Sequence, residues 1–523
     1  MPRSQTPTPI APDALKSLLE QAASLHSAGR LDEAAAIYAR VEASNPEALA
    51  ATYFNGLIDV ETGRLNDALK RFRRVVAGEP TAFNARRALA YTLRELGRWS
   101  EAEKAYRQAL EINPDSAAMR FDLAWTLEVL GRLGEAVATY RELAAKAPTR
   151  PRALSRIAHF RPSEITSDEM DEMAGMCADP EVPLGLRIAL GFGLGELLER
   201  RGRYDEAFEA FSRANALRRA NLTEPVEASG PISIAPPSAR PRAEHPEKVA
   251  REHQQWIDFA RAVFTPDLLA RHASAGSASN APIFVVGMSR SGSTLLEQVL
   301  SSHRQVQGLG ECAALPDTVM GQYPIGPASD GPGHFRDLAK AYLARLRGLG
   351  WNDAQYAVDK MLSNYLFVGM IHLMFPRAVI VHSVRDPVDT CLANFRKLFR
   401  TAHETSYDLG DIGRHYVRYR EMMDHWEAVL PGRVTSVSHE ALVANPEPRI
   451  RELISVCGLK WDPACLDFHK TERAVRTASV EQVRQPIFST SVERWRRYER
   501  HLGPLFEALG PYAPKAGLNV PCR

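Results

Sequence analysis

A glycine-containing polar loop follows a short apolar run near the middle of the chain. The run PIFVVG, from Pro282 to Gly287, is apolar and rich in β-branched residues, as in a strand buried on both faces, and MSRSGST leads from it into the helical pattern LLEQVLSSH. In such a strand, loop and helix, backbone N–H groups and a helix N-terminus converge on a phosphate. Gly287 and Gly292 have the interval of the fingerprint G-x-x-x-x-G-K-[ST], but Ser293 replaces its lysine. The loop therefore favours a donor with a single 5′-phosphate, with Arg290 as a planar cation; a Gly/Ser-rich turn without ligand is the alternative.

Two charged residues follow the loop along the chain. Glu311 stands after the sequence GLG, and Lys360 follows the strand-like run YAVD and precedes a helical pattern, SNYLFVGMIHLMF. Both have ordinary explanations. A glutamate after glycines is common in the first turn of a helix, and a strand-end lysine is often solvated beside an aspartate such as Asp359. Their roles depend on which residues the fold places beside them.

Four separated motifs over about 280–510 resemble those of sulfotransferases that use 3′-phosphoadenosine 5′-phosphosulfate, most of all the protein-tyrosine sulfotransferases. The resemblance implies that Glu311 is the catalytic base for the acceptor hydroxyl, and that Lys360 stabilises the negative charge developing on the leaving phosphate. It implies in-line transfer of a sulfuryl group without a metal, and the sequence has no His/Asp cluster with ligand spacing. The residues implied to hold the 5′-phosphosulfate end are Arg290, Ser291, Gly292, Ser293 and Thr294.

The resemblance also assigns the 3′-phosphate side of the donor. Arg385 ends the strand-like run AVIVHSV, at the sheet edge where ligands of α/β proteins collect, although a salt bridge to Asp386 or Asp389 is its structural alternative. The stretch from Ser479 to Trp495 resembles the loop that closes over the donor in this family. In it, Arg494 replaces the usual lysine. The residues assigned to this side are Arg385, Lys397, Ser479 and Arg494.

Two further residues depart from the family pattern. Ala393 stands where the family has a serine that contacts the 3′-phosphate, and His439 replaces a tyrosine near the adenine. Losing one neutral hydrogen bond would weaken donor binding by roughly 0.5–1.5 kcal/mol, unless Asn394 or water replaces it. His439 is expected to be a structural or stacking residue and not a proton carrier.

The first 221 residues carry an internal repeat. Gly-Arg pairs begin at 29, 63, 97 and 131, in steps of 34 residues. Each is followed at constant intervals by a small residue and an aromatic one, as in two helices that turn at the glycine and pack closely. The pattern resembles tetratricopeptide repeats, which bind protein or peptide segments and carry no chemistry themselves. The predicted repeats are 15–48, 49–82, 83–116, 117–150, a degenerate 151–187, and 188–221.

The sequence therefore predicts a multidomain chain. Its 523 residues correspond to about three domains. A disordered N-terminus (1–14) precedes the all-α tetratricopeptide superhelix (15–221). A Pro/Ser-rich linker (222–246), and a helix at about 245–264, lead into a three-layer α/β, P-loop-like sulfotransferase domain (247–515) with a central, mainly parallel sheet.

Composition and charge limit the binding partners and the cellular location that the sequence predicts. The formal net charge of +2 provides no global field for nucleic acid or an anionic membrane, and no secretion signal or membrane span is expected. The six cysteines form no C-x-x-C pair, which indicates reduced thiols and a cytoplasmic location. The C-terminal basic cluster is expected on the solvated face of an amphipathic helix: Arg494, Arg496, Arg497 and Arg500.

Several functions remain open at this point. The acceptor is a protein tyrosine presented by the repeats, or a carbohydrate or small alcohol. A nucleotide-triphosphate phosphotransferase is disfavoured by Ser293. A non-catalytic repeat scaffold with a degenerate nucleotide-binding domain is the alternative from another class.

Overall fold

The computed structural model describes residues 10–222, 244–322, 333–352, 354–399, 403–470, 487 and 491–514. Contacts within the chain divide these residues into two compact units, the first up to Met176 and the second from Cys177 onward. The last helix pair of the repeat pattern therefore belongs to the second unit, whereas the sequence groups it with the repeats.

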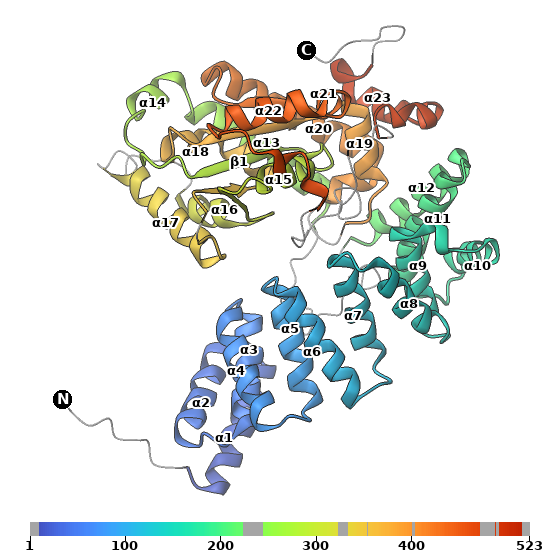
Figure 1. Cartoon of the computed structure of the whole chain (residues 1–523), viewed down its shortest axis with the longest axis vertical. Helices are drawn as coiled ribbons and strands as arrows, with labels where there is room; N and C mark the ends of the chain where they lie inside the picture. The colour runs from blue at the N-terminus through green and yellow to red at the C-terminus, as the bar shows by residue number, and fades with distance from the viewer. Residues whose placement is uncertain are drawn as a thin grey trace. The chain divides into compact units, whose positions relative to one another are not determined.

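The first unit consists of consecutive helix pairs (Figure 1). The glycines at 29, 63, 97 and 131 have φ angles of 75°, 76°, 74° and 80°, so each pair turns through a left-handed residue that favours glycine. The alanines and aromatic residues at the repeat positions are fully buried, which explains the 34-residue pattern: Ala34, Ala68, Ala102, Ala136, Tyr38, Phe72, Tyr106 and Tyr140. The helices are α1 (Pro12–Ser27), α2 (Leu31–Ser44), α3 (Leu49–Glu61), α4 (Leu65–Gly78), α5 (Phe83–Glu95), α6 (Trp99–Ile112), α7 (Ala117–Val129), α8 (Leu133–Ala144), α9 (Arg150–Phe160) and α10 (Ser167–Ala178), whose last two residues fall in the second unit.

The second unit begins with the helix pair α11 (Leu184–Arg200) and α12 (Tyr204–Ala220) and continues into an α/β domain. Its strands are β1 (Pro282–Gly287), β2 (Val306–Gly308), β3 (Tyr356–Asp359), β4 (Val379–Val384) and β5 (Thr435–Ser438). The further α-helices are α13 (Pro246–Val263), α14 (Pro266–Arg271), α15 (Ser293–Ser301), α16 (Ala314–Val319), α17 (His334–Gly348), α18 (Val368–Met374), α19 (Pro387–Phe395), α20 (Leu409–Val429), α21 (His439–Ala444), α22 (Pro446–Val456) and α23 (Gly503–Leu509). Two 3₁₀ helices bear on the site: η6 (Leu362–Phe367) and η11 (Arg494–His501).

The described strands form one parallel sheet in the order β2-β3-β1-β4-β5. Ile283 and Val285 of β1 pack into an apolar cluster with α15 and α22 on one face. Phe284 points to the other face, where its ring lies 5.6 Å from that of Tyr342 in α17. Helices therefore cover both faces of the sheet, as continuous apolar strands require. The predicted fold class, helical repeats followed by a three-layer α/β domain with a parallel sheet, is confirmed.

Candidate active site

The five strands end at one edge of the sheet, and a residue singled out in the sequence follows each of them. Arg290 follows β1, Glu311 follows β2 and Lys360 follows β3. Arg385 follows β4, and His439 follows β5. Because all strands are parallel, their carboxyl ends bring together residues that are up to 149 positions apart, 290 to 439.

The loop after β1 is closely packed against the neighbouring strand ends. Gly292 has φ 99°, and a Cβ atom there would lie 2.7 Å from Nδ1 of His439. A Cβ atom at Gly287 would lie 2.7 Å from the carbonyl oxygen of Ser383 in β4. Arg290 itself adopts φ 69°, a costly conformation for a residue with a side chain. Glycine is thus required at both positions, and the loop is held in one strained conformation.

The polar residues that continue the loop lie at and within the start of α15. Ser293 begins α15, with Gly292 as the residue before it, and Thr294 follows within the first turn. Ser291, Ser293 and Thr294 are all buried. The loop therefore runs directly into the N-terminus of α15, the end of a helix that is suited to an anion.

Lys360 and Glu311 are in direct contact. Pairing of β2 with β3 continues beyond the strands, where the N–H of Lys360 donates to the carbonyl of Gly310 at 3.0 Å. The Nζ atom of Lys360 lies 2.6 Å from Oε1 of Glu311. Lys360 is fully buried, whereas half of the Glu311 side chain (50%) is exposed. The base predicted for the acceptor thus faces solvent, and the predicted leaving-group cation lies behind it.

The ordinary explanations for these two residues do not hold. Glu311 is not in a helix, because α16 begins three residues later at Ala314. Lys360 is not solvated, and it pairs with carboxylates other than Asp359. Asp359 accepts hydrogen bonds from the hydroxyl of Tyr342 and the N–H of Met361, while burial raises its pKa to about 6.

A third charged residue, Glu297 of α15, joins the pair and was not predicted. Its Oε1 accepts the N–H of Gly310 at 2.9 Å, and its Oε2 lies 3.7 Å from Nζ of Lys360. In the sequence it is one letter of a helical pattern. The sequence offered one signal, the helical spacing that places Glu297 on the same face as Ser293 and Leu300. The structure shows all three residues buried.

Two partly buried arginines, one in the loop and one next to it, are close together. Arg385 donates to the carbonyl oxygen of Arg290 at 3.1 Å and to that of Ser491 at 2.6 Å. Its Nη2 is 3.8 Å from Oδ2 of Asp389. The alternative, a salt bridge to an aspartate, is therefore present only as this long contact. Burial, together with the nearby charges of Arg385 and Arg494, lowers the pKa of Arg290 to about 10. An anion placed among these guanidinium groups would relieve their repulsion.

The other residues predicted to contact the 3′-phosphate of the donor differ in what the structure shows of them. Lys397 lies just after α19, and its N–H donates to the carbonyl of Asn394 at 3.0 Å. Ser479 lies outside the described residues. The side-chain amide of Asn394 donates to the carbonyls of Ser289 and Thr390, both at 2.8 Å, so its two hydrogens cannot replace the serine hydroxyl that Ala393 lacks.

Arg494 differs from its expected place on a solvated face. Its Nε donates to Oε1 of Glu199 in α11 at 2.9 Å. The segment is amphipathic as expected, with Trp495 and Tyr498 buried, but it forms a 3₁₀ helix and buries part of its basic face as well. No local signal could have revealed Glu199, because 295 positions separate it from Arg494.

His439 has the structural role expected of it. Its Nε2 lies 3.3 Å from the hydroxyl oxygen of Ser491. Burial lowers its pKa to about 4, and the charges of Arg385 and Arg290 act in the same direction. The ring is therefore neutral at neutral pH and packs over Gly292.

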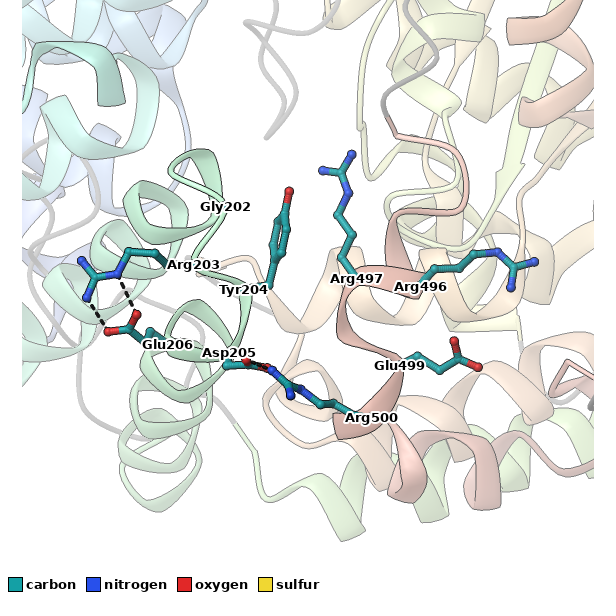
Figure 2. A pocket seen from close by; sticks show the side chains of 9 residues that line it. All are labelled: Gly202, Arg203, Tyr204, Asp205, Glu206, Arg496, Arg497, Glu499 and Arg500. Carbon is teal, nitrogen blue, oxygen red and sulfur yellow. Dashed lines mark hydrogen bonds and ion pairs between the residues drawn. The ribbon is translucent and has the colours of Figure 1, made fainter.

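A separate pocket of about 610 Å³ lies between the start of α12 and η11 (Figure 2). Its charged groups are largely compensated. Arg203 donates to Glu206 at 2.7 Å, Arg500 pairs with Asp205, and Arg497 lies over the ring of Tyr204 at 5.4 Å. Of the predicted catalytic and donor-binding residues that the structure describes, none lines it.

The described residues contain neither a helix long and apolar enough to cross a membrane nor a metal-ligating group of three or more His, Cys, Asp and Glu.

The fold and the site place the second unit among three-layer α/β domains with a phosphate-loop-like turn after the central strand. Residues 282–463 match the model of the sulfotransferase family, and residues 19–83, 55–112 and 87–151 match that of the tetratricopeptide repeat. The chain thus contains a sulfotransferase domain preceded by tetratricopeptide repeats, as the motifs predicted.

Individual proteins and solved structures are similar to parts of the chain. An uncharacterized protein from Aquifex aeolicus (strain VF5) is 33% identical over 375 residues, which are 69% of this chain and 46% of that protein; the chain therefore spans about half of the relative's length. A protein from Caenorhabditis briggsae named "Putative protein-tyrosine sulfotransferase" is 23% identical over 226 residues, covering 41% of this chain and 80% of the relative. Among solved structures, the sulfotransferase domain from the Synechococcus PCC 7002 olefin synthase has a TM-score of 0.32 and 21% identity, and covers 42% of this chain and 89% of that domain.

Proposed function

We propose that the second unit transfers a sulfuryl group from 3′-phosphoadenosine 5′-phosphosulfate to an acceptor hydroxyl. The observation that carries the proposal is the contact between the buried Lys360 and the half-exposed Glu311, 2.6 Å apart at the strand ends beside the loop of Arg290. A base open to solvent and a buried cation behind it are the two groups that this transfer needs.

In the proposed reaction, the acceptor oxygen forms a bond to sulfur while the bond between sulfur and the bridging oxygen of the donor breaks. Glu311 takes the proton of the acceptor hydroxyl. The electron pair of the broken bond goes to the leaving 3′,5′-phosphoadenosine, where Lys360 stabilises the new negative charge. Such a cation acts more strongly on the transition state than on the ground state, because the charge is still developing.

The donor is proposed to lie across the loop. The 5′ end is held by the loop and the start of α15, through Arg290 to Thr294. The 3′-phosphate is held by Arg385, Lys397 and Arg494, with Ser479 as a further contact. The hydroxyl lost at Ala393 lowers affinity but leaves these charge-assisted contacts in place.

The donor is tested by isothermal calorimetry and labelled transfer. We expect the full-length protein to bind 3′,5′-phosphoadenosine and to bind ATP at least tenfold more weakly, because Ser293 provides no ammonium group for β- and γ-phosphates. Incubation of cell extract with the ³⁵S-labelled donor should give a labelled product only when the protein is present. If the protein binds neither nucleotide and transfers no label, the chain is a repeat scaffold and the proposal is wrong.

For the acceptor, we propose a protein tyrosine that the repeats deliver to Glu311. Support comes from the usual protein ligands of tetratricopeptide repeats and from the name of the Caenorhabditis briggsae relative. A carbohydrate or small alcohol is equally compatible with a single general base.

Removal of the first unit tests this delivery. The cut should fall after α10, near residue 179, so that α11 and α12 stay with the second unit to which they belong. We expect the shortened protein to keep its affinity for 3′,5′-phosphoadenosine but to lose labelling of protein acceptors. Unchanged labelling of every acceptor would contradict delivery by the repeats, whereas lost nucleotide affinity would mean only that the shortened chain is misfolded.

A further inference from the structure

The helix pair α11–α12 is firmly attached to the sulfotransferase domain within the second unit. The side-chain amide of Asn215 donates to the carbonyl of Phe395, at the end of α19, at 2.8 Å. The ring of Phe208 stacks on His501 of η11 with 4.4 Å between centroids. Arg219 pairs with Asp411 of α20 at 2.7 Å. Contacts with three separate elements fix the position of the pair, so side chains of α11 can take part in a site of precise geometry.

Glu199, near the end of α11, is such a side chain. Only 3% of it is exposed, and both of its carboxylate oxygens accept from arginines. Oε1 accepts from Nε of Arg494 at 2.9 Å, and Oε2 accepts from Nη2 of Arg396. A carboxylate buried to this degree requires compensating cations, and two guanidinium groups provide them.

The two arginines belong to the basic group around the loop. The charge of Arg494 disfavours the charged forms of Arg290, Arg385 and Arg396, and burial with this repulsion lowers the pKa of Arg396 to about 10. The four guanidinium groups therefore lie close enough to repel one another. Two carboxylates of α11 oppose this repulsion: the charge of Glu196 favours the charged forms of Arg290 and Arg396, and Glu199 accepts hydrogen bonds from Arg396 and Arg494.

The hydrogen bonds of Glu199 leave room for a ligand on Arg494. The carboxylate uses Nε, so the bond does not engage the terminal Nη atoms. A guanidinium group has five N–H donors in a rigid plane, so a carboxylate on one edge fixes the direction of the others. Lys397, proposed for the same side of the donor, is the next residue after Arg396.

We propose that Glu199 is a positioning residue for the 3′-phosphate side of the donor, which it orders by holding Arg494 and Arg396 in place. This inference rests on the proposed function, because it assumes that the donor binds at the loop. The helix pair α11–α12, which continues the repeat pattern in sequence, then contributes a residue to the donor site within the second unit.

The test compares two nucleotides that differ in the 3′-phosphate alone. Affinities for 3′,5′-phosphoadenosine and for adenosine 5′-monophosphate are measured by calorimetry for the wild type and Glu199→Gln, which keeps the shape and removes the charge. We expect the variant to bind the bisphosphate about tenfold more weakly, as for loss of one well-aligned charge-assisted hydrogen bond, and the monophosphate within twofold of wild type.

The matched control is Glu206→Gln. Glu206 lies in α12 of the same helix pair and also pairs with an arginine, Arg203, but its side chain is 53% exposed. It should change neither affinity. In a background of Arg494→Ala, Glu199→Gln should weaken bisphosphate binding by clearly less than tenfold, because the guanidinium group through which it acts is gone.

Each other outcome is decisive. If Glu199→Gln weakens the binding of both nucleotides equally, Glu199 supports only the fold. If the variant binds both more tightly, Glu199 only neutralises the arginines. Either result overturns the inference. A wild-type protein that binds neither nucleotide would overturn the proposed function itself. If Glu199→Gln does not fold, Glu199→Asp, which keeps the charge on a shorter side chain, is judged by the same 3′-specific loss.

Discussion

Replacing Lys360 with Met is expected to lower kcat by about 10²–10³-fold, and to weaken binding of 3′,5′-phosphoadenosine, which carries the completed charge, by a smaller factor. The ammonium group is fully buried and lies 2.6 Å from Glu311, where the proposed reaction places the leaving oxygen. Its removal leaves the charge that develops on that oxygen without a partner. Initial rates with the labelled donor, together with calorimetry, measure the two effects separately.

The same substitution also affects stability, and a double variant separates the two roles. Without Lys360, the buried carboxylate of Glu297, 4% exposed, loses its cation, which costs about 3–5 kcal/mol in the free energy of unfolding. Adding Glu297→Gln removes that charge and keeps an oxygen for the N–H of Gly310. We expect the double variant to regain most of the stability and none of the turnover. Recovery of turnover along with stability would show that Lys360 is a structural residue.

Replacing Glu311 with Gln is expected to lower kcat by about 10²–10⁴-fold, because the amide cannot take the proton of the acceptor hydroxyl. Half of the side chain is exposed and Lys360 keeps Glu297 at 3.7 Å, but the buried ammonium group loses its 2.6 Å partner, so we expect a loss of about 1–3 kcal/mol in the free energy of unfolding. Steady-state rates at saturating donor give the first effect, and thermal unfolding gives the second.

Asp337→Asn is the control for Glu311→Gln. Asp337 of α17 also contacts a lysine, Lys340 at 2.9 Å, but its side chain is 73% exposed, and the hydrogen bond from that lysine lowers its pKa. The control should leave turnover unchanged. A Glu311→Gln enzyme as active as this control would remove Glu311 from the mechanism and leave the acceptor proton to another base.

Strand and repeat positions were predictable because their signals are local. The run from Pro282 to Gly287 is apolar at every position, and β1 has these bounds. The glycines of the repeats turn the chain through a left-handed conformation that side chains disfavour, so their spacing marks each helix pair. The helix expected at about 245–264 is α13. In each case, residues close together in the sequence are sufficient to determine the element.

The candidate site was predictable in part because a parallel sheet collects its strand ends. The resemblance named Arg290, Glu311, Lys360 and Arg385, and the strand order β2-β3-β1-β4-β5 brings the segments that carry them to one edge. Whether Lys360 would point into solvent or toward Glu311 depended on packing. Its complete burial, and the hydrogen bond that the N–H of Gly310 donates to Glu297, decided that orientation.

The sequence by itself determined the local elements and the types of residue available for chemistry, because hydrophobic periodicity and turn glycines act over a few positions. Tertiary structure alone decided which charges meet. The buried carboxylate of Glu199 and the guanidinium of Arg494 are 295 positions apart, and neither has a sequence neighbour that would reveal the other. A buried charge must find its partner in space, and that requirement is met by the packing of whole elements and leaves no local pattern.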